Sequence, residues 1–389
     1  MRGWRMLLVT LLMAVMLTGC WDRTEVNDIA IVLATAYDVD KDGKYRLAVQ
    51  VPLPGQLGGK SGGGGGTSGS KSFYVDSSTG VSIRDASQKV QQRMPRQLFY
   101  AHRRILVIGE ELAKKGIRPV FDAAARIPEN RLTASIVIAK GNGYDLLSRQ
   151  PRFERFSSEG IREIVNDESV FNTSLKDAAQ HLSLEGSDAM IPLVKVKSTE
   201  GTKDKNEELQ FASYALFHDD KMVAVMDQDG SEGIRWLKQQ VKPYTVTLTS
   251  ENGETLLVNI YKGNAKVKPR RVKDHFEFEV HNRVTAYVLE NVGGGDLSVP
   301  ENVQKINRRL EEHITQTVYA AVDEIHEHKV DVAGLGLVVA RNFPKEWRST
   351  YNDNWYEELE KTKFHVTTVV NISRIGLTSE NLAKRAEVE

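Results

Sequence analysis

The only cysteine of this 389-residue chain, Cys20, closes the segment Leu17-Thr18-Gly19-Cys20. This segment has the form of a bacterial lipobox, in which the cysteine sulfur is diacylated and the cysteine becomes the mature N-terminus. A single cysteine excludes an intramolecular disulfide and any cysteine-rich zinc or iron–sulfur site. An ordinary secretory signal with a chance cysteine is the disfavoured alternative, because the small residues and the position of Cys20 agree with the lipobox.

The residues before Cys20 have the pattern of a cleaved signal peptide, 1–19. Arg2 and Arg5 precede an apolar run over 6–17, whose 12 residues are too few to cross a membrane. A spanning helix needs about 20 apolar residues, whereas a signal-peptide core needs fewer. No other segment of the sequence approaches that length, so we expect a body outside the cytoplasm that is held at a membrane surface.

The lipid on Cys20 is the expected anchor, with Trp21 next to it in the headgroup region that indole rings favour. Each buried CH₂ group contributes ~0.8 kcal/mol, so two long acyl chains hold a protein stably where one does not. Cleavage leaves 50 basic against 52 acidic residues, a net charge of −2. Attraction of basic residues to anionic lipid therefore supplies no general anchoring.

Asp38, Asp40 and Asp42, followed by Gly43, match the first half of a calcium-binding EF-hand loop. The last position of such a loop requires a bidentate Glu, but Val49 stands there and the flanking residues have strand patterns. An Asp-Gly hairpin turn explains this sequence better than a calcium site.

Two glycine-containing segments resemble nucleotide-binding loops but lack required residues. Gly59-Lys60-Ser61 imitates the end of a phosphate loop, but Pro54 stands where its first glycine belongs. Gly334 and Gly336 resemble a dinucleotide fingerprint, but Val339 replaces its third glycine or alanine. We therefore expect no cofactor.

His313, His326 and His328 share one predicted helix and invite a test for a metal site. At 100° per residue, His326 and His328 point about 160° apart, and His313 and His326 about 140° apart, so they do not converge on one ion. We expect all three histidine rings to lie in solvent on the sides of the helix, and we expect no metal.

The sequence shows no catalytic nucleophile, because it has neither a Gly-x-Ser-x-Gly elbow nor a free cysteine. We therefore expect no enzyme. The balance of 52 basic and 52 acidic residues argues against nucleic-acid binding.

Four aromatic residues, Trp347, Tyr351, Trp355 and Tyr356, lie close together near the end of the chain. Exposed Trp and Tyr are preferred anchors of protein interfaces. We favour a place in the core of the second half instead, because burying so many rings stabilises a domain by several kcal/mol.

Strands alternate with helices in the first half, which predicts an α/β layer. Predicted strands cover 28–37, 45–51, 104–108 and 132–139. Apolar residues at helical spacing predict a helix that begins near Ile83, and a further helix is predicted over 119–125. The segment 58–69 holds eight glycines in its 12 positions and is expected to be a long surface loop.

The polar segment 198–208 is the best candidate for a domain boundary. Beyond it the sequence predicts strands over 211–217, 222–226, 244–248, 255–261, 265–268, 275–289 and 364–372. One long helix has its apolar stripe at Val303, Ile306, Leu310, Ile314, Val318, Ala321 and Ile325. We predict a mixed α/β domain over 20–200, which could consist of two parts that meet near residue 150. A C-terminal α+β domain over 207–380 follows, a mostly antiparallel sheet with one long packed helix.

Three segments in order resemble the Ger(x)C family of spore germination lipoproteins. Cys20-Trp21-Asp22-Arg23-Thr24-Glu25 is similar to that family's start, and the segment from Ala101-His102-Arg103-Arg104 to Ala113 is similar to its central strand and helix. Asp331-Val332-Ala333-Gly334-Leu335-Gly336, then Pro344 to Trp347 and Trp355, follow the family pattern near the end. The match runs from Cys20 to Gly376, and the glycine-rich loop departs from it.

The resemblance implies a C subunit of a nutrient germinant receptor at the inner membrane of the spore. Its partners would be an A subunit with a membrane-spanning part and a B subunit similar to amino-acid permeases. The resemblance implies docking or signal relay, since nutrient recognition is attributed to the B subunit. The alternatives are a lipid-anchored solute-binding protein, which would need a deep cleft between domains, and an envelope hydrolase, for which no catalytic constellation is visible.

Overall fold

The structure is a computed structural model that describes residues 3–4, 25–53, 72–199, 207–249, 253–273, 275–292 and 295–376. Cys20, Trp21 and the glycine-rich segment 58–69 with Gly59-Lys60-Ser61 lie outside the described residues. In the part of the chain that is described, no helix combines the length and apolar character needed to span a membrane.

An eight-stranded sheet forms the centre of the first half, in the order β10-β9-β8-β7-β6-β2-β3-β4. Its strands are β2 (Ala34–Val39), β3 (Tyr45–Pro52), β4 (Phe73–Gly80), β6 (Ile105–Gly109), β7 (Ser135–Ala139), β8 (Met190–Ser198), β9 (Glu207–His218) and β10 (Lys221–Val225). The central strands β2, β6, β7 and β8 run parallel, and the outer pairs are antiparallel. Every residue of β6 and β7 is buried, because helices cover both faces of the sheet.

Six helices enclose this sheet, which confirms the α/β layer predicted for the first half. They are α2 (Ile83–Gln91), α3 (Glu110–Lys115), α4 (Arg118–Ala125), α5 (Gly143–Ser148), α6 (Ser157–Asn166) and α7 (Leu175–His181). Residues of α2, α3, α4 and α7 share one apolar core with one face of the sheet. Residues of α5 and α6 fill a second core on the other face.

The single strand predicted over 28–37 is two strands. After the short helical turn η1 (Val26–Asp28), β1 (Ile29–Ile31) pairs in parallel with β5 (Gln97–Phe99), and β2 joins the large sheet. The backbone changes partners between them, because Val32 N donates to Phe99 O and Leu33 N donates to Gln50 O. A continuous apolar run does not reveal such a change of partner.

The polar segment predicted as a domain boundary falls inside a β-hairpin. β8 and β9, on either side of it, pair antiparallel from Ser198 and Glu207 to Met190 and Leu216. β9 and β10 therefore belong to the first sheet, although the predicted second domain begins at 207. The chain leaves this sheet after Val225 and enters α8 (Gln228–Leu237).

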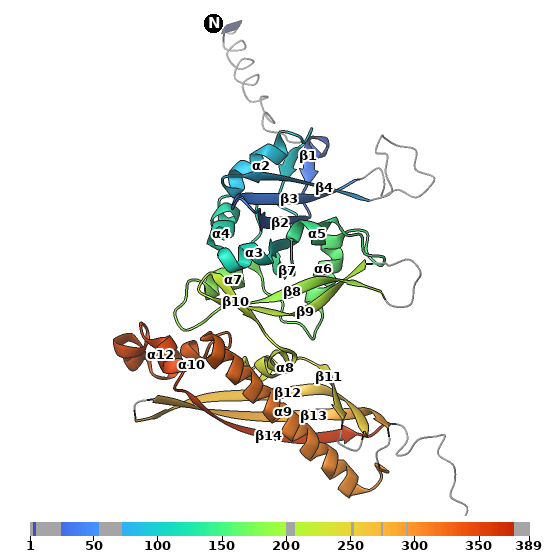
Figure 1. The fold of residues 1–389 in the computed structure, drawn as a ribbon, viewed down its shortest axis with the longest axis vertical. Helices are drawn as coiled ribbons and strands as arrows, with labels where there is room; N and C mark the ends of the chain where they lie inside the picture. Colours follow the sequence, from blue (N-terminus) through green and yellow to red (C-terminus); the bar gives the residue numbers. More distant parts are fainter. Residues whose placement is uncertain are drawn as a thin grey trace, which may run out of the picture.

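The second half is a four-stranded sheet with a long helix across it, as predicted (Figure 1). Its strands are β11 (Tyr244–Thr249), β12 (Thr255–Val272), β13 (His275–Val292) and β14 (Lys363–Arg374). β11, β12 and β13 are antiparallel neighbours, and β14 pairs with β13 in parallel. The two strands predicted over 255–261 and 265–268 are the single strand β12, with a register shift between Ile260 and Lys262.

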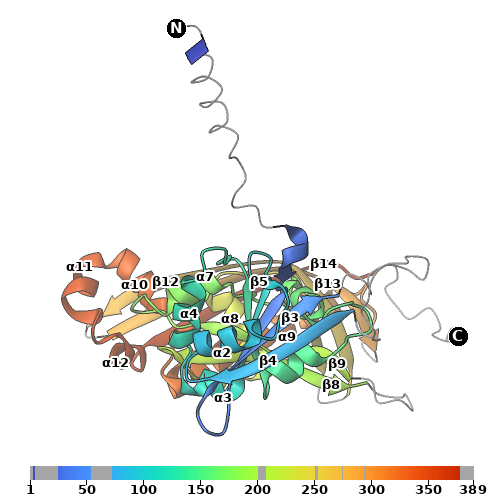
Figure 2. The same ribbon diagram turned by 90° about the horizontal axis from the view of Figure 1, so that it is seen from above.

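The long helix α9 (Pro300–His328) buries the predicted apolar stripe from Ile306 to Ile325, and Val303 is half-buried. Short helical segments follow it: α10 (Leu335–Asn342), α11 (Pro344–Glu346), the π-helical turn η3 (Trp347–Tyr351) and α12 (Trp355–Leu359). Figure 2 shows α10, α11 and α12 together at one end of the molecule.

Helices α8 and α9 approach each other closely at Gly233. A Cβ atom at this position would lie 1.8 Å from the carbonyl oxygen of Thr317, which belongs to the backbone of α9. Backbone cannot rotate away as a flexible side chain can, so even a methyl group would force the helices apart.

We therefore expect Gly233→Ala to lower the free energy of unfolding by about 1–3 kcal/mol, the usual cost of overpacking. Urea unfolding of the purified protein, followed by tryptophan fluorescence, measures the change. Gln228→Ala, at an exposed position of the same helix, is the control and should change little. Equal stability of both variants and the unsubstituted protein would contradict the close approach.

Candidate functional site: a buried polar junction between the two halves

The carboxylate of Asp331 is fully buried where the C-terminal helical segments meet the first half. Its Oδ1 accepts a hydrogen bond from Leu335 N at 2.8 Å. Its Oδ2 accepts from Gly336 N at 2.7 Å and from the indole Nε1 of Trp355 at 2.9 Å. The side chain thus caps the start of α10 and fixes Trp355 of α12 with three N–H donors.

The two glycines of this segment serve backbone geometry and packing. Gly334 has φ +73°, in the left-handed region where a side chain is strained. A Cβ on Gly336 would lie 2.5 Å from the Cα of Gly186 and 2.9 Å from Cε2 of Trp355. The spacing that resembles a dinucleotide fingerprint is therefore explained by the close packing of α10 on the first half.

Asp188, two residues before β8 begins, meets this segment from the first half. Its Oδ2 accepts from Asp331 N at 2.7 Å, and its own backbone N donates to Asp331 O at 2.9 Å. Its Oδ1 accepts from the hydroxyl of Tyr356 at 3.0 Å and from Asp219 N at 3.3 Å. Asp188 is 3% exposed, so these bonds form away from water and join the two halves directly.

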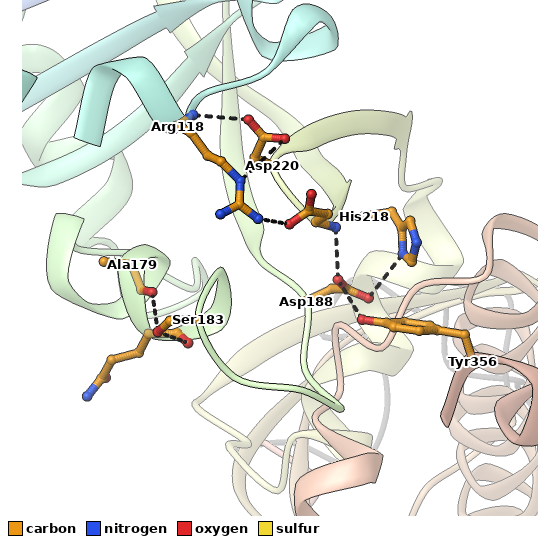
Figure 3. A network of polar contacts seen from close by, with 9 residues as sticks. Arg118, Ala179, Ser183, Asp188, His218, Asp220 and Tyr356 are labelled. Atoms are coloured by element: carbon orange, nitrogen blue, oxygen red, sulfur yellow. Dashed lines mark hydrogen bonds and ion pairs between the residues drawn. The ribbon is translucent and has the colours of Figure 1, made fainter. Parts of the chain in front are cut away.

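His218, at the end of β9, flanks the pair formed by Asp188 and Tyr356 (Figure 3). Its Nδ1 lies 3.8 Å from Asp188 Oδ2, an ion-pair distance when the ring is protonated. Its ring packs edge-on against Tyr356, with centroids 4.6 Å apart. The Asp188 carboxylate raises the pKa of His218, which favours the charged imidazolium beside it.

The network continues into the first half through the turn between β9 and β10. Asp219 forms an ion pair with Arg118 of α4, and Asp220 Oδ2 accepts from Arg118 N at 3.2 Å (Figure 3). Ile117 N also donates to Asp220 O at 2.9 Å. Polar contacts therefore run without interruption from α4, through the β9–β10 turn and Asp188, to Tyr356 in the second half.

Two partly buried basic side chains, Lys238 and His181, also lie at the junction. Lys238, which caps the end of α8, donates from Nζ to Val332 O at 2.9 Å. Burial lowers the pKa of Lys238, and the nearby charge of Asp331 opposes that change. Burial also raises the pKa of Asp331 to about 6, against the effect of its N–H donors. Burial lowers the pKa of His181, which bonds Ser187 Oγ at 2.7 Å, to about 4.

The aromatic cluster mostly belongs to the core, as predicted. Trp347, Tyr351 and Trp355 are buried, and the rings of Trp347 and Trp355 lie 5.5 Å apart. Tyr356 is the exception, because it is half-buried and its hydroxyl bonds Asp188 across the junction.

The calcium-like segment is a hairpin turn, as predicted. Asp40 Oδ1 accepts from the backbone N of Asp42 and of Lys44, and Gly43 has φ +77°. Asp38 points elsewhere: its buried carboxylate accepts from Gly143 N at 2.7 Å and Tyr144 N at 3.0 Å at the start of α5. Burial raises the pKa of Asp38 despite these donors.

The prediction that the three helix histidines are solvated is wrong. His313 Nε2 bonds Glu232 Oε1 at 2.9 Å, His326 Nε2 bonds Thr362 Oγ1 at 3.0 Å, and His328 lies 3.3 Å from Glu324. Each ring is half-buried: Glu232 belongs to α8, Thr362 follows α12, and Glu324 lies one turn earlier in α9 itself. Among the described residues, no three His, Cys, Asp or Glu side chains are grouped as metal ligands.

Sequence reasoning did not single out Asp188, His218 or Lys238. Asp188 and Asp331 are 143 residues apart, and no short motif joins them. The only sequence feature that pointed to the junction was the Asp331 segment, in which an acidic residue precedes two closely spaced glycines.

We expect Asp331→Asn to lower the free energy of unfolding by about 1–3 kcal/mol, since in either orientation its NH₂ group faces a buried N–H donor. Urea unfolding at neutral pH measures the loss. Asp353→Asn, at an exposed position nearby, is the matched control and should be nearly neutral. A neutral Asp331→Asn substitution would show that the three bonds do not stabilise the junction.

Known proteins with similar sequences share both halves of this architecture. Residues 22–196 match the family described as "Spore germination protein N-terminal domain", and residues 212–376 match "Spore germination B3/ GerAC like, C-terminal". YfkR of Bacillus subtilis (strain 168) is 32% identical over 382 residues, which cover 96% of this chain and 97% of YfkR. Spore germination protein KC of the same organism is 26% identical, with 94% of each chain covered.

The crystal structure of the GerBC protein has the same fold. It superposes with a TM-score of 0.54 at 16% identity and covers 87% of this chain and 96% of its own. The two family matches together cover most of the sequence, in the order that the three sequence segments indicated. The chain belongs to the Ger(x)C family of spore germination proteins.

Proposed function

We propose that this protein is the lipid-anchored C subunit of a nutrient germinant receptor in the spore. In this role it sits on the outer face of the spore's inner membrane, docks with integral-membrane A and B subunits, and relays their response to nutrient. It acts by contact and catalyses no reaction. Family membership and the lipobox that ends at Cys20 support this proposal.

The observation that favours relay is the polar junction between the halves. Asp188, Asp331 and Trp355 are each at most 3% exposed, and Asp331 bonds to both of the others. A buried network of this kind is stable when complete and costly when partly broken, so it favours discrete arrangements over gradual deformation. Such a junction suits a protein that must transmit the movement of one half to the other.

A lipid-anchored solute-binding protein is the second candidate. It would hold nutrient in a deep cleft between its halves, where polar groups converge. At the junction described above, the converging polar groups bond to one another, and the Trp355 side chain fills the space beside them. Calorimetry against amino acids and sugars separates the two functions, because a saturable micromolar response would favour the solute-binding protein.

We expect Cys20→Ala to release a folded protein from the membrane and to abolish nutrient-triggered germination, since the acyl chains are the proposed anchor. Membrane fractionation of spores and the loss of optical density after nutrient addition measure both effects. A variant with the signal peptide of another lipoprotein in place of 1–19, and Cys20 retained, is the control and should restore them. Full germination with a soluble, unlipidated protein would contradict the anchoring.

We expect Tyr356→Phe to slow nutrient-triggered germination while the amount of protein at the membrane stays unchanged. The substitution removes only the hydroxyl that bonds Asp188 across the junction, a loss of about 1 kcal/mol. Tyr319→Phe is the control, because its hydroxyl bonds Phe364 O within the second half. Equal germination rates for both variants would argue against relay through the junction.

A further inference from the structure

A depression of about 250 Å³ opens at the amino ends of the parallel strands β6 and β7. Its lining is dominated by basic and amide side chains, and no carboxylate is among the lining residues. The hydrogen-bond donors that line it include Arg103, Arg104, Arg131, Ser135, Arg162 and Asn172.

Arg103 contributes a buried positive charge to this depression. The residue is 1% exposed, and its guanidinium donates to Thr35 Oγ1 at 3.1 Å, Tyr37 OH at 2.9 Å and Asn130 Oδ1 at 2.8 Å. All three partners are neutral, and within the described residues Nε has no partner. A buried cation without an opposite charge is costly, so a nearby anion would stabilise it.

Three more guanidinium groups surround the depression, and only part of their charge is balanced. Glu159 accepts from Arg104 Nη1 at 3.0 Å and from Arg162 Nε at 2.8 Å. Arg162 also bonds Glu163. Arg131 is exposed and forms no ion pair with any carboxylate in the described ranges. Four arginines therefore share two carboxylates, which leaves a local excess of positive charge.

The neutral lining groups add donors of the kind that an oxyanion needs. Asn172 Nδ2 donates to Ser135 Oγ at 2.9 Å, so the hydroxyl hydrogen of Ser135 is left to donate to another acceptor. Ser135 is 7% exposed and starts β7, so its hydroxyl is held in place by the sheet. Guanidinium forks and hydroxyl donors together match the geometry of phosphate oxygens.

We propose that this depression, which we call the arginine pocket, binds the phosphate group of a small phosphorylated ligand. The ligand's phosphate oxygens accept from Arg131, from the free N–H groups of Arg104 and from the Ser135 hydroxyl. The positive charge of Arg103 adds attraction while its bonds to Thr35, Tyr37 and Asn130 stay in place. Glu159 competes with the phosphate for Arg104 and Arg162, so it limits the affinity.

Two sources could supply such a phosphate: a free phosphomonoester, or the headgroup of an anionic phospholipid. Arg104 N donates to Leu33 O at 2.9 Å, so the pocket adjoins the segment that leads back to Cys20. Lipidation at Cys20 would hold this end of the protein near the headgroups. The lipid source rests on the proposed anchoring, whereas phosphate binding itself does not.

The test uses the full-length protein in micelles of an uncharged detergent, titrated by calorimetry with inorganic phosphate and with glycerol phosphate at constant ionic strength. We expect saturable binding of both probes. Arg131→Gln should weaken binding about tenfold, the value of one lost hydrogen bond to a charged group. Glu159→Gln should tighten binding several-fold, because it frees Arg104 and Arg162. Arg341→Gln, an exposed arginine in the second half, is the matched control.

Micelles doped with phosphatidylglycerol or with phosphatidylcholine then distinguish the sources. Displacement of bound phosphate by phosphatidylglycerol alone would support the proposal with a lipid headgroup as the ligand. Binding without displacement by either lipid would support it with a free phosphomonoester. Absence of saturable binding would overturn the proposal, as would equal affinities of the unsubstituted protein, Arg131→Gln and Glu159→Gln. A tighter Glu159→Gln variant could not follow from lost folding.

Discussion

A single buried carboxylate organises the contact between the two halves of this protein. Asp331 has no exposed surface, and an ionised carboxyl in that position is costly unless N–H groups replace the water it loses. Backbone N–H groups at the start of α10 and the indole of Trp355 do so. The same segment presents Asp331 N to Asp188. The bonds that order the start of α10 and those that close the junction therefore meet at one residue.

The arginine pocket and the junction lie at the same end of the first sheet, where the parallel strands β6, β7 and β8 begin. Asn172 bonds Ser135 in the pocket, and the next residue, Thr173, donates to Met190 O at 2.8 Å. Met190 follows Asp188 closely in the chain and starts β8. A shift of the segment around Thr173 would thus reach both places. The two places are therefore joined by a continuous run of bonded residues.

Elements that rest on local patterns followed from the sequence, whereas those that rest on distant partners did not. The apolar stripe of α9, the buried strands β6 and β7 and the Asp40 turn needed only periodicity and turn chemistry. The division of 28–37 into two strands and the hairpin across 198–208 depend on which strand lies alongside. Asp188 could not be found, because its partners are set by the fold and not by spacing. Two partners of the helix histidines were missed for the same reason, since Glu232 lies in α8 and Thr362 follows α12.

The bonds between Asp188 and Asp331 also close a loop of 143 residues that contains most of the second half. The entropy lost in closing a flexible loop grows only as the logarithm of its length, so doubling the length adds only about 0.6 kcal/mol. Residues can therefore be gained or lost between these two aspartates with almost no penalty to closure. Variation in the length of the second half therefore changes the closure entropy of the junction very little.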